Sequence, residues 1–307
     1  MTGPLIALTG STGFIGRHLL RSLSARGYRV RVLLRRPVEA LPEGASGAVV
    51  GDLARPINMA AALAGVDAVV HSAGLAHAMS GAPDDDFRSS NTEATGRLAE
   101  AAQRARVRRF VFLSSIRAQS GPSAAAPLCE TDSPAPTDAY GRSKLAAEEA
   151  LARTGLDWAA LRPVLVYGAG VKGNMAALLR LARSPYPLPL ASLTGRRSLV
   201  SLESLASAVA SVLEAPAPIG RALIVADPDP LTLPEMLAAL RSGLGRPAGL
   251  LPMPPALLGL ACRLTGRGEL FERVAGGLVA RSDGLARLGW EPALTTRDGL
   301  ARLAARG

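Results

Sequence analysis

Residues 9–16 read Thr9-Gly10-Ser11-Thr12-Gly13-Phe14-Ile15-Gly16 and place three glycines at a GxxGxxG spacing. A short apolar run over residues 4–9 precedes them, and an apolar-periodic segment over residues 14–25 follows. This order predicts a strand, a tight turn and a helix whose first N–H groups point at an anion. The first glycine permits the turn, the second admits a pyrophosphate, and the third allows close helix–strand packing. The stretch therefore favours a dinucleotide site over an ordinary glycine-rich turn.

Apolar runs and helical segments alternate outward from this loop. We expect strands at residues 28–34, 47–50, 68–71, 110–113 and 158–166, and helices at residues 57–63, 92–105 and 143–154. Such alternation is typical of an α/β fold, here a Rossmann doubly wound parallel sheet. Beyond Gly168 the pattern changes to helices separated by Pro-rich loops. We therefore expect a dinucleotide-binding domain at residues 1–167 and a smaller, more helical substrate-binding region at residues 168–307, with some segments packing back on the first domain.

Composition narrows the class of protein. The chain has 307 residues, 48% of them apolar, and only two cysteines, Cys129 and Cys262, which form no CxxC pair. No metal site or disulfide framework is indicated. No apolar run reaches the roughly 18 to 20 residues that a membrane helix needs. We expect a cytoplasmic protein without a membrane span, and we expect residues 256–264 to form a helix buried on the domain rather than an interfacial one.

The formal net charge of +10 raises nucleic-acid binding as an alternative. Arginines are spread along the whole chain, however, and aromatic residues make up only 4% of it. A small phosphorylated ligand explains the charge at least as well, so we expect no nucleic-acid partner. Lys144 and Lys172 are the only lysines among 35 basic residues. They mark positions where a flexible point charge is needed.

The residues after the second and third predicted strands bear on cofactor choice. Arg35 and Arg36 stand where NAD-binding proteins usually carry an acid for the ribose hydroxyls. Two guanidiniums suit a 2′-phosphate, so NADP(H) is favoured over NAD, the alternative being a solvated charge pair. Asp52, followed by Leu53, is placed to accept a hydrogen bond from the adenine amino group, or only to cap a loop.

A candidate proton-transfer site follows the middle strands. Tyr140 and Lys144 are four residues apart, on one face of a predicted helix. An ammonium beside a phenol is expected to lower the phenol's pKa toward neutral pH. Ser114 and Ser115 end the strand about 25 residues earlier, where a hydroxyl can bond to the same substrate oxygen. The combination indicates hydride-transfer chemistry on a ketone or carbinol.

With these motifs the sequence resembles the extended short-chain dehydrogenase/reductase family, the sugar-nucleotide epimerases, dehydratases and reductases. The resemblance covers nearly the whole chain. It rests on TGSTGFIG (9–16), GDL (51–53), HSAG (71–74), NTEATG (91–96), FVFLSS (110–115), Tyr140 with Lys144, LRPVLVYG (161–168), RSLV (197–200) and LGWEP (288–292).

The resemblance implies residue roles. Ser115 orients the substrate, Tyr140 is the acid/base, and Lys144 holds the nicotinamide ribose and tunes the tyrosine. The implied cofactor contacts are Gly10, Thr12, Gly13, Phe14, Ile15, Gly16, Arg35, Arg36, Asp52, Leu53, Ser72, Ala73, Gly74, Asn91, Ser114, Tyr140, Lys144 and Pro163. The implied substrate contacts are Ser115, Tyr140, Lys172, Asn174 and Arg197. Gly74 departs from the family, which usually carries Ala there.

The closest resemblance is to bacterial UDP-N-acetylhexosamine 4-epimerases and 4-keto-reductases. Dehydration is disfavoured because Ile116-Arg117 follows Ser115 where dehydratases carry an acidic pair. Exchange with an NADPH pool suits a reductase, so we expect reduction of a 4-keto UDP-sugar. The alternatives are a 4-epimerase with retained NAD, a non-catalytic NADP-binding protein, and a dehydrogenase of apolar alcohols covered by residues 250–264. The family resemblance also implies a homodimer through the helices at residues 92–105 and 143–154.

Overall fold

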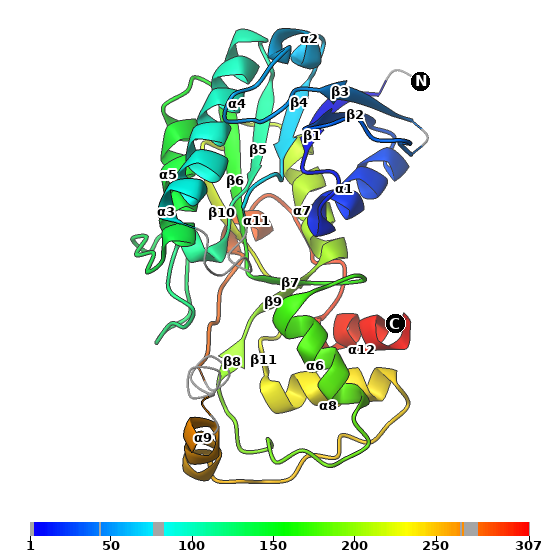
Figure 1. Ribbon diagram of the computed structural model, residues 1–307, viewed down its shortest axis with the longest axis vertical. Helices are drawn as coiled ribbons and strands as arrows, with labels where there is room; N and C mark the ends of the chain where they lie inside the picture. Colours follow the sequence, from blue (N-terminus) through cyan, green and yellow to red (C-terminus); the bar gives the residue numbers. More distant parts are fainter. Residues whose placement is uncertain (1–2, 43, 76–82, 265, 267–275, 307) are drawn as a thin grey trace.

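The computed structural model describes residues 3–42, 44–75, 83–264, 266 and 276–306. Its centre is a seven-stranded parallel sheet with the order β10-β6-β5-β4-β1-β2-β3 (Figure 1). The strands are β1 (Leu5–Thr9), β2 (Arg29–Leu34), β3 (Ala45–Val49), β4 (Ala68–His71), β5 (Arg109–Leu113), β6 (Asp157–Pro163) and β10 (Arg221–Val225). The predicted Rossmann fold is confirmed.

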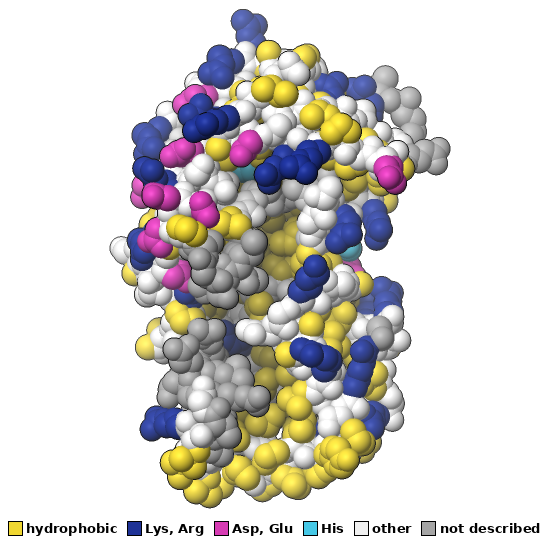
Figure 2. Space-filling model, in the orientation of Figure 1, with side chains coloured by type: hydrophobic (Ala, Val, Ile, Leu, Met, Phe, Trp, Pro, Cys, Tyr) yellow, Lys and Arg dark blue, Asp and Glu magenta, His cyan; other side chains and the backbone are white. Residues whose placement is uncertain are grey.

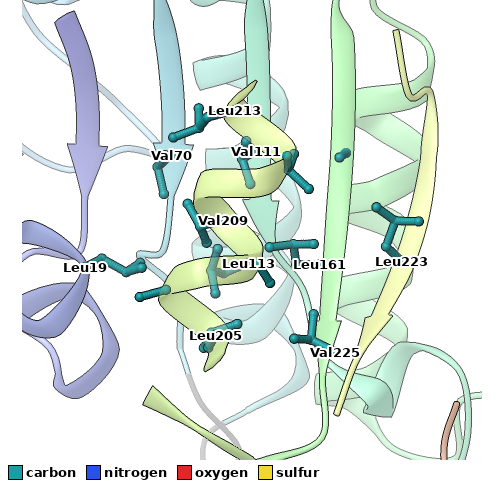
Figure 3. Close-up of a cluster of buried hydrophobic side chains, with 14 of the residues drawn as sticks. Leu19, Val70, Val111, Leu113, Leu161, Leu205, Val209, Leu213, Leu223 and Val225 are labelled. Carbon is teal, nitrogen blue, oxygen red and sulfur yellow. The ribbon is translucent and has the colours of Figure 1, made fainter. Parts of the chain in front are cut away.

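Helices cover both faces of this sheet, because the apolar strand residues project from both. One face packs against α1 (Phe14–Ala25) and α7 (Leu202–Glu214). Figure 3 shows Leu205, Val209 and Leu213 of α7 in one apolar cluster with Val111, Leu113 and Leu161 of the strands. The other face packs against α2 (Met59–Leu63), α4 (Ala94–Arg104) and α5 (Ala139–Ala152). We call the sheet with these five helices the sheet region.

A second region lies beyond the carboxyl ends of the strands (Figure 1). Its core joins α6 (Gly173–Arg183), α8 (Leu233–Gly243) and α12 (Thr296–Arg306) around Tyr167 and Leu199. Two small sheets border it, made of β7 (Leu165–Tyr167) with β9 (Leu199–Ser201), and β8 (Arg196–Arg197) with β11 (Leu231–Thr232). We call this the helical region. Part of residues 168–307 nevertheless lies on the sheet region, namely α7, β10 and α11 (Asp283–Ala286).

The predicted elements mostly hold, and the differences have local causes. The expected strand at residues 158–166 is divided: β6 ends at Pro163, and Val164 donates its N–H to the Val225 carbonyl as the chain leaves the main sheet. Helix α5 begins at Ala139 rather than residue 143, because Asp138 caps the N–H of Gly141. The expected helix at residues 92–105 begins within η1 (Arg88–Glu93), a π-helical segment that follows α3 (Asp84–Phe87).

Helix α9 (Pro255–Leu264) forms as predicted, but the expectation that it is buried is wrong. Leu257, Leu260 and Leu264 are all more than half exposed. Figure 1 shows α9 at the edge of the helical region, apart from α6, α8 and α12. Among the described helices none is long and apolar enough to cross a bilayer. Cys129 is a free thiol, and the side chain of Cys262 lies outside the described residues.

Candidate active site

The glycine loop between β1 and α1, which we call the glycine cradle, packs so closely against neighbouring backbone that two of its glycines leave no room for a side chain. A Cβ on Gly10, whose φ is +72°, would lie 2.6 Å from the Ala73 nitrogen, and one on Gly16 would lie 2.0 Å from the Gly10 oxygen. Gly13 is the N-cap of α1 and supplies no side chain, and the first turn carries no acid. The amides around Phe14 and Ile15 therefore face the cradle without a competing side-chain acceptor. This end of α1, with Thr12 beside it, fits the pyrophosphate of a dinucleotide.

The residues expected at the adenosine end follow the next two strands. Arg35 and Arg36 are exposed directly after β2, so both guanidiniums are accessible to a ligand. Asp52 accepts a hydrogen bond from the Ala54 N–H at 2.9 Å through one carboxylate oxygen. Asp52 therefore caps its loop, as the alternative interpretation predicts, and this bond engages only one of its two carboxylate oxygens. Leu53 is half-buried beside it.

Positive side chains are not restricted to this end of the molecule. Figure 2 shows lysine and arginine side chains over both regions of the face in view, whereas acidic side chains gather on the side of α3, α4 and α5. On this face the positive charge is therefore spread over both regions rather than gathered at one site.

The loop after β4 connects the glycine cradle to the proton-transfer residues. Ser72 donates a hydrogen bond to the Thr9 carbonyl at 2.7 Å, so its hydroxyl fixes the loop to β1. A Cβ on Gly74 would lie 2.8 Å from Asn91 Oδ1 and 3.2 Å from Lys144 Nζ. The departure from the usual Ala at Gly74 thus has a physical reason, because Asn91 and Lys144 occupy that space.

Asn91 joins this loop to helix α5. Its amide oxygen accepts from the Leu75 N–H at 2.8 Å, and its Nδ2 donates to the Leu75 carbonyl and to Ser143 Oγ at 3.1 and 2.9 Å. Ser143 in turn donates to the Tyr140 carbonyl at 2.8 Å. All the hydrogen-bonding groups of this buried amide are engaged with the protein, so Asn91 lies behind the site and holds Tyr140's helix against the cofactor loop.

A buried hydrogen-bond chain that sequence reasoning missed lies beneath the same loop. Thr9 Oγ1 accepts the Ala73 N–H and lies 2.7 Å from His71 Nδ1, to which it donates because Nδ1 of a ring protonated on Nε2 is an acceptor. Thr95 donates to the Asn91 carbonyl at 2.5 Å, so its oxygen accepts from His71 Nε2 at 3.0 Å. Burial, with the nearby Lys144 charge, lowers the pKa of His71 to about 3. His71 is therefore neutral and protonated on Nε2.

Ser115 and Tyr140 lie together at the carboxyl end of β5. The Ser115 hydroxyl lies close enough to the Tyr140 phenol to favour its ionised form through hydrogen bonding, so both hydroxyls can reach one substrate oxygen. Phe87 lies edge-on to the Tyr140 ring with centroids 6.1 Å apart. Burial raises the pKa of the Tyr140 phenol, and the Ser115 hydrogen bond opposes that rise only in part. The sequence-based expectation of a pKa lowered by Lys144 is wrong for this state, because desolvation outweighs the charges and the charged groups acting on Tyr140 are Asp138 and Arg117.

Lys144 is buried between the cofactor loop and the sheet. Its Nζ donates to the Leu113 carbonyl at 2.9 Å and lies 4.7 Å from the centroid of the Phe112 ring. Burial lowers the pKa of Lys144 to about 8, and the Glu148 carboxylate acts in the opposite direction. Lys144 extends from the same helix as Tyr140 and places its ammonium next to Gly74.

Glu148 belongs to a buried ion-pair network that the sequence reasoning also missed. Its two oxygens bond to Arg162 Nε and Nη2 at 3.0 and 2.5 Å, and Ser114 donates its hydroxyl to Oε1. Arg162 also donates to Gln119 Oε1. The Ser114 side chain is therefore part of this ion-pair network. The signal in the sequence was an acid one helical turn after Lys144 on a buried helix face. Arg162 and Pro163 are the last two residues of β6.

Three of the five residues expected at the substrate, Lys172, Asn174 and Arg197, lie in the helical region. Lys172 is the N-cap residue of α6, and Asn174 lies in its first turn; both are exposed. Arg197 in β8 donates to the carbonyls of Pro122 and Gly276 at 3.2 and 2.8 Å. The elements that carry these three residues, α6 and β8, lie beyond the carboxyl ends of the strands of the main sheet (Figure 1). Within the described part of the chain no cluster of His, Cys, Asp or Glu could hold a metal ion.

The protein has relatives with established names. The model of the NAD dependent epimerase/dehydratase family matches residues 6–226. A UDP-glucose 4-epimerase of Vibrio cholerae is 34% identical over 310 residues, which cover 97% of this chain and 94% of that protein. A ceramide reductase of Caulobacter vibrioides is 33% identical over 214 residues, 69% of this chain and 62% of the reductase.

Solved structures share the fold. MoeE5, in complex with UDP-glucuronic acid and NAD, is 25% identical with a TM-score of 0.74, and 98% of each chain is covered. The UDP-N-acetylglucosamine 4-epimerase from Bacillus cereus is 22% identical with a TM-score of 0.81, covering 99% of this chain and 100% of that one. Given the match over most of the chain, with the glycine cradle and the Ser115, Tyr140 and Lys144 cluster in place, the protein belongs to the NAD dependent epimerase/dehydratase family, the extended short-chain dehydrogenase/reductases.

Proposed function

We propose that the protein reduces the 4-keto group of a UDP-linked N-acetylhexosamine, with Tyr140 as proton donor. The observation that carries this proposal is that the Ser115 and Tyr140 hydroxyls lie close together, with Lys144 on the same helix as Tyr140, since this gives one carbonyl oxygen two hydroxyl partners. A bound nicotinamide cofactor would supply the hydride. The carbonyl oxygen would take the Tyr140 proton, and Lys144 would stabilise the phenolate that remains.

The protonation state of Tyr140 supports reduction. Burial raises the pKa of its phenol, so the group carries the proton that a reductase delivers at neutral pH. Ser115 would hold the substrate oxygen, and Asn91, fully engaged with Leu75 and Ser143, would keep the helix of Tyr140 in register with the cofactor loop.

NADPH is the cofactor that the exposed residues after β2 favour. Arg35 and Arg36 offer two guanidiniums where an acid would repel a 2′-phosphate. Replacing both by Ser should weaken NADPH binding by roughly tenfold or more while leaving NADH binding nearly unchanged. Arg26→Ser, at the opposite end of α1, is the matched control. Equal loss for both cofactors would contradict the assignment.

A UDP-sugar 4-epimerase is the second candidate. The 34% identity to the Vibrio cholerae enzyme over nearly the whole chain favours it. The two activities separate cleanly in one assay: a reductase consumes NADPH stoichiometrically with a 4-keto UDP-sugar, whereas an epimerase interconverts two UDP-sugars with no net cofactor consumption. Tightly held NAD in the purified protein would favour the epimerase.

Tyr140→Phe tests the proton role. We expect turnover to fall by about 10²- to 10⁴-fold with unchanged cofactor binding. Tyr186→Phe, at an exposed tyrosine of the helical region, is the control and should be neutral. Full activity of Tyr140→Phe would refute the assignment, and cofactor binding without turnover of any UDP-sugar by the wild type would favour a non-catalytic NADP-binding protein.

A further inference from the structure

Arg117 stands at the junction of the two regions without a role in the steps above. It lies in η2 (Ile116–Ala118), two residues after Ser115, and its side chain is 16% exposed. One guanidinium nitrogen, Nη2, pairs with the Asp138 carboxylate. Its Nε and Nη1 are buried and have no hydrogen-bond acceptor among the described residues. Buried donors without acceptors are costly and in native proteins call for an explanation.

A second guanidinium faces the same space from the helical region. Arg197 in β8 bonds to the Pro122 carbonyl, five residues along the chain from Arg117. The two charges are close enough that Arg117 contributes, after burial, to a lowered pKa of Arg197. Like charges held together in a partly desolvated environment repel each other. An anion between the two regions would relieve this repulsion.

Arg117 is also fixed against the reacting end of the site. A Cβ on Gly141, the residue after Tyr140, would lie 2.3 Å from the Arg117 carbonyl oxygen. Asp138, the partner of Arg117, caps the Gly141 N–H at 2.7 Å. Asp138 therefore holds the guanidinium at the start of Tyr140's helix, where its charge acts on the Tyr140 phenol.

We propose that Arg117 binds an anionic oxygen group of the substrate close to the reacting carbon. This inference rests on the proposed nucleotide-sugar substrate and narrows it. Two sources offer that chemistry: a carboxylate on the sugar, and the phosphate that links the sugar to the nucleotide. Both present oxygens that accept charge-assisted hydrogen bonds from a guanidinium.

Binding of three probes to the NADPH-loaded protein tests the proposal and separates the sources. UDP, UDP-glucose and UDP-glucuronate share the diphosphate, and only the last carries a carboxylate. Calorimetry with Arg117→Gln should show affinity reduced by roughly 10- to 100-fold for UDP-glucuronate alone if the carboxylate is bound, or for all three probes if the phosphate is bound. Arg142→Gln removes an exposed arginine that also pairs with an aspartate and should bind all three probes like the wild type.

Two further measurements exclude a merely structural effect. NADPH affinity of Arg117→Gln should stay within about twofold of the wild type, because a distorted α5 would also displace Lys144. Arg117→Lys keeps the charge and the Asp138 pair but has a single nitrogen, so it should fold and still lose affinity at least threefold. Unchanged affinity for every probe in both variants, or a parallel loss of NADPH binding, overturns the proposal.

Failure of this inference and failure of the proposed function can be told apart. If the wild type binds the probes but Arg117 variants bind them equally well, only the anion site falls. If the wild type binds no UDP probe, the anion site and the nucleotide-sugar substrate fall together, and an apolar alcohol substrate is favoured. Loss of turnover in Tyr140→Phe with retained probe binding leaves the anion site intact.

Discussion

The two regions hold their site residues in opposite ways. In the sheet region Asn91, Ser115 and Lys144 are buried. Asn91 donates a hydrogen bond to Ser143 of α5, and Lys144 donates one to the Leu113 carbonyl at the end of β5. In the helical region Lys172 and Asn174 are exposed on the first turn of α6. Proton transfer needs fixed geometry and a controlled pKa, whereas recognition of a flexible polar ligand tolerates mobile side chains. We propose from this difference that the sheet region performs the chemistry and that the helical region selects the substrate presented to it.

Breaking the buried network under Lys144 should have the largest effect. Glu148→Gln leaves the Arg162 guanidinium buried without its carboxylate, and we expect the free energy of unfolding to fall by about 3–5 kcal/mol. Glu149→Gln, at the exposed neighbour on the same helix, should change it by less than about 0.5 kcal/mol. Chemical denaturation measures both. Equal losses in the two variants would show that the network is not what stabilises α5.

The buried His71 predicts a pH dependence of stability for the sheet region. Its pKa is lowered to about 3 from 6.5, so the unfolded chain binds the extra proton as pH falls below 6.5 while the folded protein does not. Stability should therefore fall with decreasing pH, by up to about 1.4 kcal/mol per pH unit from this group. Denaturation between pH 6.5 and 4.5, above most carboxylate titration, should show a flatter slope in His71→Asn. A slope unchanged from the wild type would mean that other groups produce it.

A Cβ at Gly74 should damage cofactor binding more than stability. It would press on Asn91 Oδ1 and Lys144 Nζ, the groups that join the β4 loop to α5. We expect Gly74→Ala to weaken NADPH binding by roughly tenfold, about 1.4 kcal/mol. Gly170→Ala is the contrasting variant, because its φ of +82° is strained but the space around it is open, so it should affect stability only. Fluorescence titration of NADPH separates the two outcomes.

Features that depend on neighbouring residues could be predicted from the sequence, whereas features that depend on burial or on contacts between distant segments could not. The β1–loop–α1 unit was predicted closely, since glycine spacing and apolar period are local signals. The division of β6 from β7 was missed because a continuous apolar run does not show that its strands join different sheets. The direction of the Tyr140 pKa shift was wrong because residue spacing reports a nearby charge but not the burial that opposes it. The Thr9, His71 and Thr95 chain has no spacing signal at all, since its members come from three separate elements.

Lys172 provides the smallest and most discriminating change. If the helical region only presents the substrate, Lys172→Gln should raise KM for the UDP-sugar by less than about tenfold, leave kcat unchanged, and alter stability by less than about 0.5 kcal/mol. An exposed ammonium acts through a field that salt screens within about 10 Å at 0.1 M, so the wild-type KM should rise with ionic strength more steeply than that of the variant. Arg180→Gln, an exposed charge in the last turn of the same helix, should keep the wild-type salt dependence. A kcat that falls with Lys172→Gln would instead place this side chain among the groups that act on the transition state, and the division of labour between the two regions would fail.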